Sequence, residues 1–257
     1  MSSAIARRLF RERCQFENPI YTYTPPFGEL RALKRAAQRF PSRFAKVAGE
    51  GKPSAFKVGD YVRVRDAAAI RATLNEQAAC RGLVFTKAQW ESCGKTYRVE
   101  TVVRRMMDDT GRMRAISRTV GLEHVMCDGP RGDDGCGRAC PLLYRDEWLE
   151  PSSAELAETP GFARYARVKP LAEILATLDR NGLRDGLMFA PEMRRYADGR
   201  YPVYKQVTHL TTTPWRRAGP ESYVLAGARC FGEALGRDGP CHRGCRLIWH
   251  KDWLEFD

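Results

Sequence analysis

A cysteine pattern that occurs twice places the strongest constraint on this chain. Three cysteines spaced C-x8-C-x3-C precede Trp148-Leu149-Glu150, and three more cysteines precede Trp253-Leu254-Glu255. Because the same construction ends both halves of the chain, we expect two related units, each closed by its own cysteine cluster. The first set is Cys127, Cys136 and Cys140, and the second set is Cys230, Cys241 and Cys245.

The sequence that precedes each set repeats as well. A shift of 104 positions overlays segments of the first half on segments of the second half. A register kept over about 100 residues indicates two domain-sized repeats, which are larger than the units of a solenoid. We therefore expect a first repeat at residues 53–153, a second repeat at 160–257 and a separate arm at 1–52. The matching segments include Tyr61 and Tyr165, Val64 and Val168, residues 70–74 and 174–178, Gly82-Leu83 and Gly186-Leu187, and Tyr97 and Tyr201.

Each repeat reads as a strand, a short helix and then three or four short strands. Alternation of apolar and polar residues from Tyr61 onward is a strand signal, and residues 67–74 are typical of a short helix. Further strands are expected at 94–103 and 119–125, with a hairpin turn at 108–111. This order predicts a mainly β fold with short helices, built as two tandem small β-barrels of the Src-homology-3 type. Such a barrel has a thin core, so a metal bound between its loops would compensate.

Three further motifs resemble those of a family of small bacterial proteins. They are clearest in the second repeat, as Ile174–Asp179, Gly186–Met193 and Trp249–Leu254. The family consists mainly of uncharacterised single-copy domains that often accompany biosynthetic enzymes. The resemblance covers residues 56–257 and implies the fold and metal binding more than an activity. In the family pattern a cysteine precedes the G-x-x-Y/F-x-V strand. Cys93 matches it in the first repeat, whereas the second repeat has Ala197-Asp198 there.

The cysteines are predicted to bind metal. The chain has nine cysteines and no secretion signal at its arginine-containing N-terminus, which indicates a reducing, cytoplasmic compartment where clustered cysteines are metal ligands more often than disulfides. In the first repeat the candidate ligands are Cys93, Cys127, Cys136 and Cys140. Four thiolates make a closed tetrahedral site for zinc, which we expect in preference to an iron–sulfur cluster. The alternative is that the cysteines pack as small apolar side chains.

The second repeat supplies three cysteine ligands and leaves the fourth open. The candidates for it are His242, His209, His250, Asp198 and water. His242 is adjacent to Cys241 and can complete a closed site, which gives a second zinc site. Three protein ligands with a water would instead be the arrangement of a catalytic zinc. A metal-dependent biosynthetic enzyme that works at this site is therefore the alternative to a non-enzymatic binding protein.

Charge points to an acidic partner. The net charge is +12, and residues 1–50 hold +6 of it, with ten basic and four acidic residues. We expect an α-helical arm that contacts a polyanion, either a nucleic acid or an acidic protein such as a carrier or companion enzyme. The alternative is a solvated helical extension packed on the first barrel. The candidate contacts are Arg7, Arg8, Lys34 and Arg35 in the arm, and Trp215, Arg216 and Arg217 in a long loop of the second repeat.

The hydropathy of the chain bears on whether it crosses a membrane. The chain contains no run of about 18 apolar residues, so we expect no membrane span.

Overall fold

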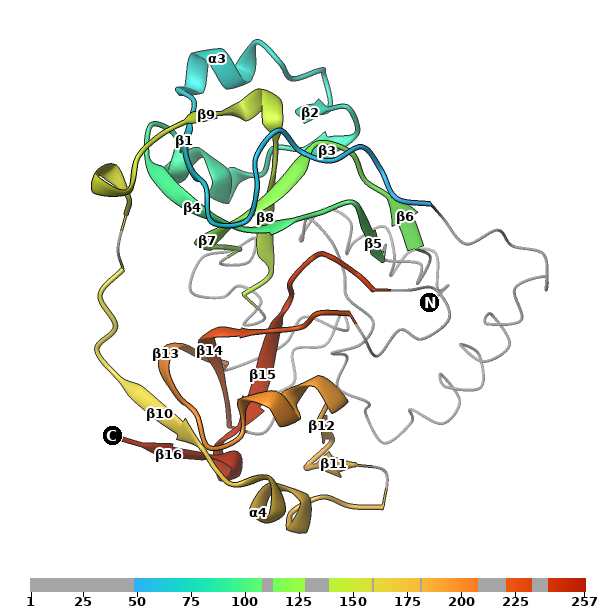
Figure 1. Cartoon of the computed structure of the whole chain (residues 1–257), viewed down its shortest axis with the longest axis vertical. Coiled ribbons are helices and arrows are strands. Elements are labelled where there is room, and N and C mark those ends of the chain that lie inside the picture. Colours follow the sequence, from blue (N-terminus) through green and yellow to red (C-terminus); the bar gives the residue numbers. More distant parts are fainter. Residues whose placement is uncertain are drawn as a thin grey trace, which may run out of the picture.

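The computed structural model of the chain (Figure 1) describes residues 49–107, 113–127, 139–158, 160–180, 182–207, 221–232 and 240–257. Residues 1–48 of the predicted arm, the turn predicted at 108–111, Cys136 and the candidate contacts at 215–217 lie outside these ranges. We call the described residues up to 158 the first unit and those from 160 onward the second unit. Figure 1 shows the sheets of the two units one above the other, with residues 152–158 and 160–164 along one side between them.

Five antiparallel strands form the sheet of the first unit, in the order β8-β7-β4-β1-β9. Their bounds are β1 Tyr61–Val64, β4 Thr96–Val102, β7 Thr119–Met126, β8 Pro141–Arg145 and β9 Leu149–Pro151. The strands predicted at 94–103 and 119–125 are thus confirmed as β4 and β7. The remaining elements are α3 Ala67–Arg71, β2 Ala79–Cys80, β3 Leu83–Val84, β5 Arg105–Met107, β6 Met113–Ala115, and the 3-10 turns η2 Lys87–Ser92, η4 Asp146–Trp148 and η5 Ala154–Leu156.

The sheet of the second unit has the corresponding order, β15-β14-β13-β10-β16. Its strands are β10 Tyr165–Val168, β13 Arg200–Val207, β14 Ser222–Arg229, β15 Arg246–His250 and β16 Leu254–Phe256. The other elements are α4 Leu171–Ala176, β11 Leu183–Arg184, β12 Leu187–Met188, and the 3-10 turns η6 Pro191–Tyr196 and η8 Lys251–Trp253. Apart from β5, β6 and η5, each element of the first unit therefore has a counterpart among the described residues of the second.

The prediction of a mainly β protein with short helices is confirmed. Both sheets are curled, and each is open in the described residues (Figure 1). In the first sheet the edge strands are β8 and β9, and no ladder joins them within the described part of the chain. The described residues therefore show open, curled sheets. The prediction of closed barrels, each closed by cysteines, goes beyond this observation.

Buried tryptophans explain why the same short motif occurs in both units. Trp148 and Trp253 are fully buried, and each indole N–H needs an acceptor inside the protein. The Trp148 Nε1–H donates to Thr73 Oγ1 at 2.9 Å, and the Trp253 Nε1–H donates to Thr177 Oγ1 at 3.0 Å. Both threonines follow the short helix of their unit, which fixes that helix against the 3-10 turn before the last strand.

The two units pack against each other through side chains that enter the neighbouring core. Cys241 of the second unit belongs to the buried cluster of the first unit. Met126 and Ala139 of the first unit belong to the buried cluster of the second unit. We call this contact the junction. It joins the ends of β7 and β8 to the segment that precedes β15.

One further property concerns the helices. Among the described residues, none of the helices has both the length and the apolar character that a membrane crossing requires.

Candidate metal centre

The ends of the long strands bring two cysteines of each set together. In the first unit the Cys127 N–H donates to the Cys140 carbonyl at 2.8 Å, where β7 ends and β8 is about to begin. In the second unit the Cys230 N–H donates to the Cys245 carbonyl, also at 2.8 Å, between β14 and β15. Cys127 and Cys140 thus make the same backbone contact as Cys230 and Cys245.

Cys241 lies in the loop that leads into Cys245. It is 7% exposed, and burial raises the pKa of its thiol, as would a negative charge on Cys245. Backbone hydrogen bonds from Met107 and Arg243, and the charge of the Arg243 guanidinium, act in the opposite direction on this pKa. A thiolate at Cys241 thus has donors and a cation beside it, although solvent is excluded.

Cys230 also has a donor aimed at its sulfur. The Gly232 N–H donates to Cys230 Sγ at 3.1 Å. Gly232 has a φ of +72°, and a Cβ at this position would lie 2.2 Å from the Cys241 backbone nitrogen. Only glycine allows the chain to turn here and the Cys241 loop to approach so closely. Hydrogen bonds to sulfur of this kind orient and tune thiolate ligands of metals.

The donor set suits a thiophilic ion. Cys230, Cys241 and Cys245 are all at most 7% exposed and offer soft sulfur ligands, which zinc accepts. Their three sulfur atoms do not all lie within 4.8 Å of one another. In a tetrahedral site with zinc–sulfur bonds of about 2.3 Å, sulfurs are separated by about 3.8 Å. Zinc binding would therefore draw the three sulfur atoms closer together.

His242 faces the first unit. Its backbone N–H donates to the Arg105 carbonyl at 3.0 Å, and its Nδ1 accepts the Arg104 N–H at 3.3 Å. Burial lowers the pKa of His242, so the ring is neutral at pH 7 and can accept this bond. The residue predicted as the fourth ligand thus has one ring nitrogen engaged at the junction.

Two of the other candidates for the fourth ligand, Asp198 and His250, are engaged with other groups. Asp198 lies 3.9 Å from Arg167 in an exposed ion pair. His250 stands at the far end of β15 from Cys245 and is bonded to other groups there. His209 lies outside the described residues.

In the first unit the predicted four-cysteine site is only partly described, because Cys136 lies outside the described residues. Cys93 follows η2, and its charged neighbours are Arg71 and Asp66 at the two ends of α3. Burial raises the pKa of the Cys93 thiol. Among the described residues, Cys93, Cys127 and Cys140 do not form a group of three with sulfurs within 4.8 Å. The four-cysteine site remains a prediction.

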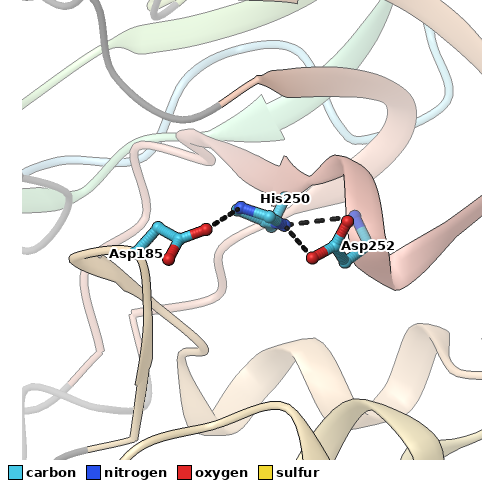
Figure 2. A group of neighbouring side chains, drawn as sticks. All are labelled: Asp185, His250 and Asp252. Atoms are coloured by element: carbon cyan, nitrogen blue, oxygen red, sulfur yellow. Dashed lines mark hydrogen bonds and ion pairs between the residues drawn. The ribbon is translucent and has the colours of Figure 1, made fainter.

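One cluster of metal-ligand type was not predicted. Asp185, His250 and Asp252 place one ligand atom each within 4.8 Å of the others (Figure 2). Asp185 Oδ2 lies 3.1 Å from His250 Nε2, and His250 Nδ1 accepts the Asp252 N–H at 3.1 Å. Arg184 already supplies a cation, since its Nη2 donates to Asp252 Oδ2 at 2.8 Å.

These bonds make the His250 cluster a structural tie. Because Nδ1 accepts a backbone N–H, the ring proton lies on Nε2 and is donated to Asp185. Neither ring nitrogen is then open to a metal. His250 is 2% exposed, and burial lowers its pKa although Asp252 and Asp185 oppose this. The cluster holds the β11–β12 turn against the corner between β15 and η8.

The first unit fills the equivalent position with Arg145, which occupies the place in β8 that His250 has in β15. Its guanidinium donates to the Cys80 and Arg81 carbonyls at 3.3 and 2.6 Å, and to Thr119 Oγ1 at 3.0 Å. Both side chains therefore tie a short hairpin to the end of the sheet. A sequence alignment of the two halves pairs Arg145 with His250. Two polar residues at the same position, each at the end of an apolar strand, are the signal that could have drawn attention to His250.

The predicted polyanion contacts lie outside the described residues: Arg7, Arg8, Lys34, Arg35, Trp215, Arg216 and Arg217. On the sheets, several basic side chains are paired with acids. Arg63 bonds Glu150 at 2.6 Å, and Arg98 bonds Glu123 at 2.8 Å. These pairs neutralise part of the positive charge of the sheets.

Comparison with models of known protein families and with curated protein sequences gives no match to the chain. Its function is therefore inferred from the cysteines, the junction and the distribution of charge.

Proposed function

We propose that this protein is a zinc-stabilised, non-enzymatic binding protein. In this proposal residues 53–153 and 160–257 are tandem barrel-type repeats, each closed by a cysteine cluster, and residues 1–52 form a basic helical arm. The arm and the Trp215–Arg217 loop bind a polyanionic or acidic partner, and the reducing cytoplasm keeps the thiols free to bind zinc. The resemblance to domains that accompany biosynthetic enzymes is compatible with an accessory role of this kind.

The observation that carries the metal assignment is the environment of Cys230, Cys241 and Cys245. The three side chains are at most 7% exposed, and backbone donors reach the sulfurs of Cys230 and Cys241. Structural zinc sites are closed, whereas catalytic sites keep a position open for water and substrate. Burial of all three cysteines limits the access of water and substrate to the metal, and this supports a structural zinc over the alternative, a metal-dependent biosynthetic enzyme.

The distribution of charge supports the role of the arm. Residues 1–50 carry +6 of the net +12, in less than a fifth of the 257 residues. On the sheets, ion pairs such as Arg63–Glu150 and Arg98–Glu123 reduce the excess. A partner that responds to positive charge would thus be drawn most strongly to the arm.

The test of partner binding is a gel-shift titration of the full chain with mixed-sequence RNA and DNA at two salt concentrations. If phosphates are neutralised by the arm, affinity falls steeply with salt, because counterions are released. Removal of residues 1–50 should weaken binding and flatten the salt slope, and Trp215→Ala should cost about 1–3 kcal/mol if the indole stacks on a base. No binding at about 50 mM salt would exclude nucleic acid and leave an acidic protein as the partner.

A further inference from the structure

The loop that carries two of the buried cysteines is also the loop that contacts the first unit. Cys241 packs into the core of the first unit, and its sulfur accepts a backbone hydrogen bond from Met107 of that unit. The next residue, His242, forms two hydrogen bonds with the backbone of Arg104 and Arg105. Cysteines and inter-unit contacts thus alternate along the same six residues, 240–245.

The backbone of this loop lies close to β4 of the first unit. Gly244, with a φ of +70°, lies so near Thr101 in β4 that a Cβ would stand 2.8 Å from the threonine Cγ2. Larger residues at 244 would push the loop away from the first unit. Glycine at position 244 therefore allows the loop to lie this close to β4.

An ion pair across the junction begins where the loop ends. Arg246 follows Cys245 directly and donates to both carboxylate oxygens of Glu100 in β4, at 2.7 and 2.8 Å. The opposite residue in β14, Arg229, donates to the Glu100 carbonyl at 2.7 Å. A buried pair is favourable only when its geometry is well held. The position of Arg246 depends on the loop that holds Cys241 and Cys245.

The cations around the cysteines also favour a bound metal. Zinc with three thiolates has a net negative charge, which the nearby guanidinium of Arg243 would favour. A metal bound to Cys230, Cys241 and Cys245 would also tie the loop to the end of β14 at both of its cysteines. Such a tie offsets the conformational entropy that ordering the loop costs.

From these contacts we propose that metal binding at Cys230, Cys241 and Cys245 docks the two units on each other. With metal the units form one rigid body. Without it they become two folded units tethered by residues 152–164, because each unit keeps a hydrophobic cluster of its own. This inference rests on the proposed metal binding, and it adds what the metal does.

The test compares the zinc-loaded and chelated full-length protein by small-angle scattering and by limited proteolysis of residues 152–164, with zinc measured on the same samples. Chelation should enlarge the radius of gyration and speed cleavage of the connection by about tenfold or more, since cleavage follows the population of the open state. The far-ultraviolet circular dichroism should be retained, and added zinc should restore the compact form.

Two variants separate docking from metal binding. Cys245→Ser should lose one zinc and behave as the chelated protein does. Glu100→Gln should keep its zinc and yet show faster cleavage, because the carboxylate that holds Arg246 is gone. Zinc loss without a change in size or cleavage would overturn the docking inference alone, as would chelation that unfolds both sheets together. Wild-type protein that binds no metal would overturn the proposed function and this inference with it.

Discussion

The carboxylate of Glu100 in β4 accepts two hydrogen bonds from the guanidinium of Arg246 in β15, at 2.7 and 2.8 Å. The two residues are 146 positions apart in sequence and belong to different sheets. Their side chains are 12% and 4% exposed, so the pair is shielded from water. The junction is therefore held by a bidentate ion pair as well as by apolar contacts.

Removal of one partner from this ion pair should lower the free energy of unfolding considerably. Glu100→Gln leaves the Arg246 charge buried without its counter-ion, and such changes cost about 3–5 kcal/mol. The measurement is the free energy of unfolding of the full chain in urea. The matched control is Glu123→Gln, which breaks the exposed Arg98–Glu123 pair and should cost at most about 1 kcal/mol. Equal losses in the two variants would contradict the assigned role of Glu100.

His124 adopts a left-handed backbone conformation, with a φ of +62°. The equivalent position of β14 is Gly227, which has a φ of +82° and adopts this conformation without strain. The His124 ring packs edge to face on Phe162 of the connecting segment, with 5.6 Å between centroids. The ring contact thus offsets part of the backbone strain.

At position 124, a glycine variant should be more stable than an alanine variant, which is the reverse of the usual order in a strand. Both His124→Gly and His124→Ala remove the ring, but only glycine also relieves the strain. The glycine variant should therefore be about 1 kcal/mol more stable than the alanine variant, whereas glycine is normally the weaker residue in a strand. Urea unfolding of the two variants measures this difference. An alanine variant as stable as the glycine variant would show that the conformation is not strained.

Acid should weaken the second unit through His250. Burial lowers the pKa of His250 from its usual value of about 6.5, so the unfolded chain binds a proton more readily than the folded chain. The stability from the neutral ring is complete above about pH 6.5 and is lost as the pH falls below it. The free energy of unfolding of His250→Gln should therefore depend less on pH between about 7 and 5. A variant whose pH dependence matches the wild type would contradict this assignment.

Much of the local fold follows from sequence patterns. Alternation from Tyr61 predicts β1, and the apolar and β-branched run that ends near Val103 predicts β4. The correspondence of Thr73 with Thr177 is explained by one hydrogen bond to a buried tryptophan in each unit. Such features depend on neighbouring residues and on repeat spacing, which a sequence displays.

The junction could not be predicted in the same way. The repeat pattern places Cys241 with Cys245 inside a self-contained second repeat, whereas Cys241 packs into the core of the other unit. No periodicity relates Glu100 to Arg246, because the contact depends on how two complete sheets dock. His242 was expected among the cysteines, and its ring nitrogen instead accepts a bond from the first unit. The left-handed His124 could have been found by aligning it with Gly227.

The central claim is that the buried cysteines hold metal, and the most direct measurement is elemental analysis of protein purified without added metal. The two sets of cysteines predict about two zinc ions per chain. Cys245→Ser and Cys140→Ser should each lose about one of them, whereas Cys80→Ser, outside both sets, should lose none. Less than about half an equivalent of any transition metal in the wild-type protein would contradict the account.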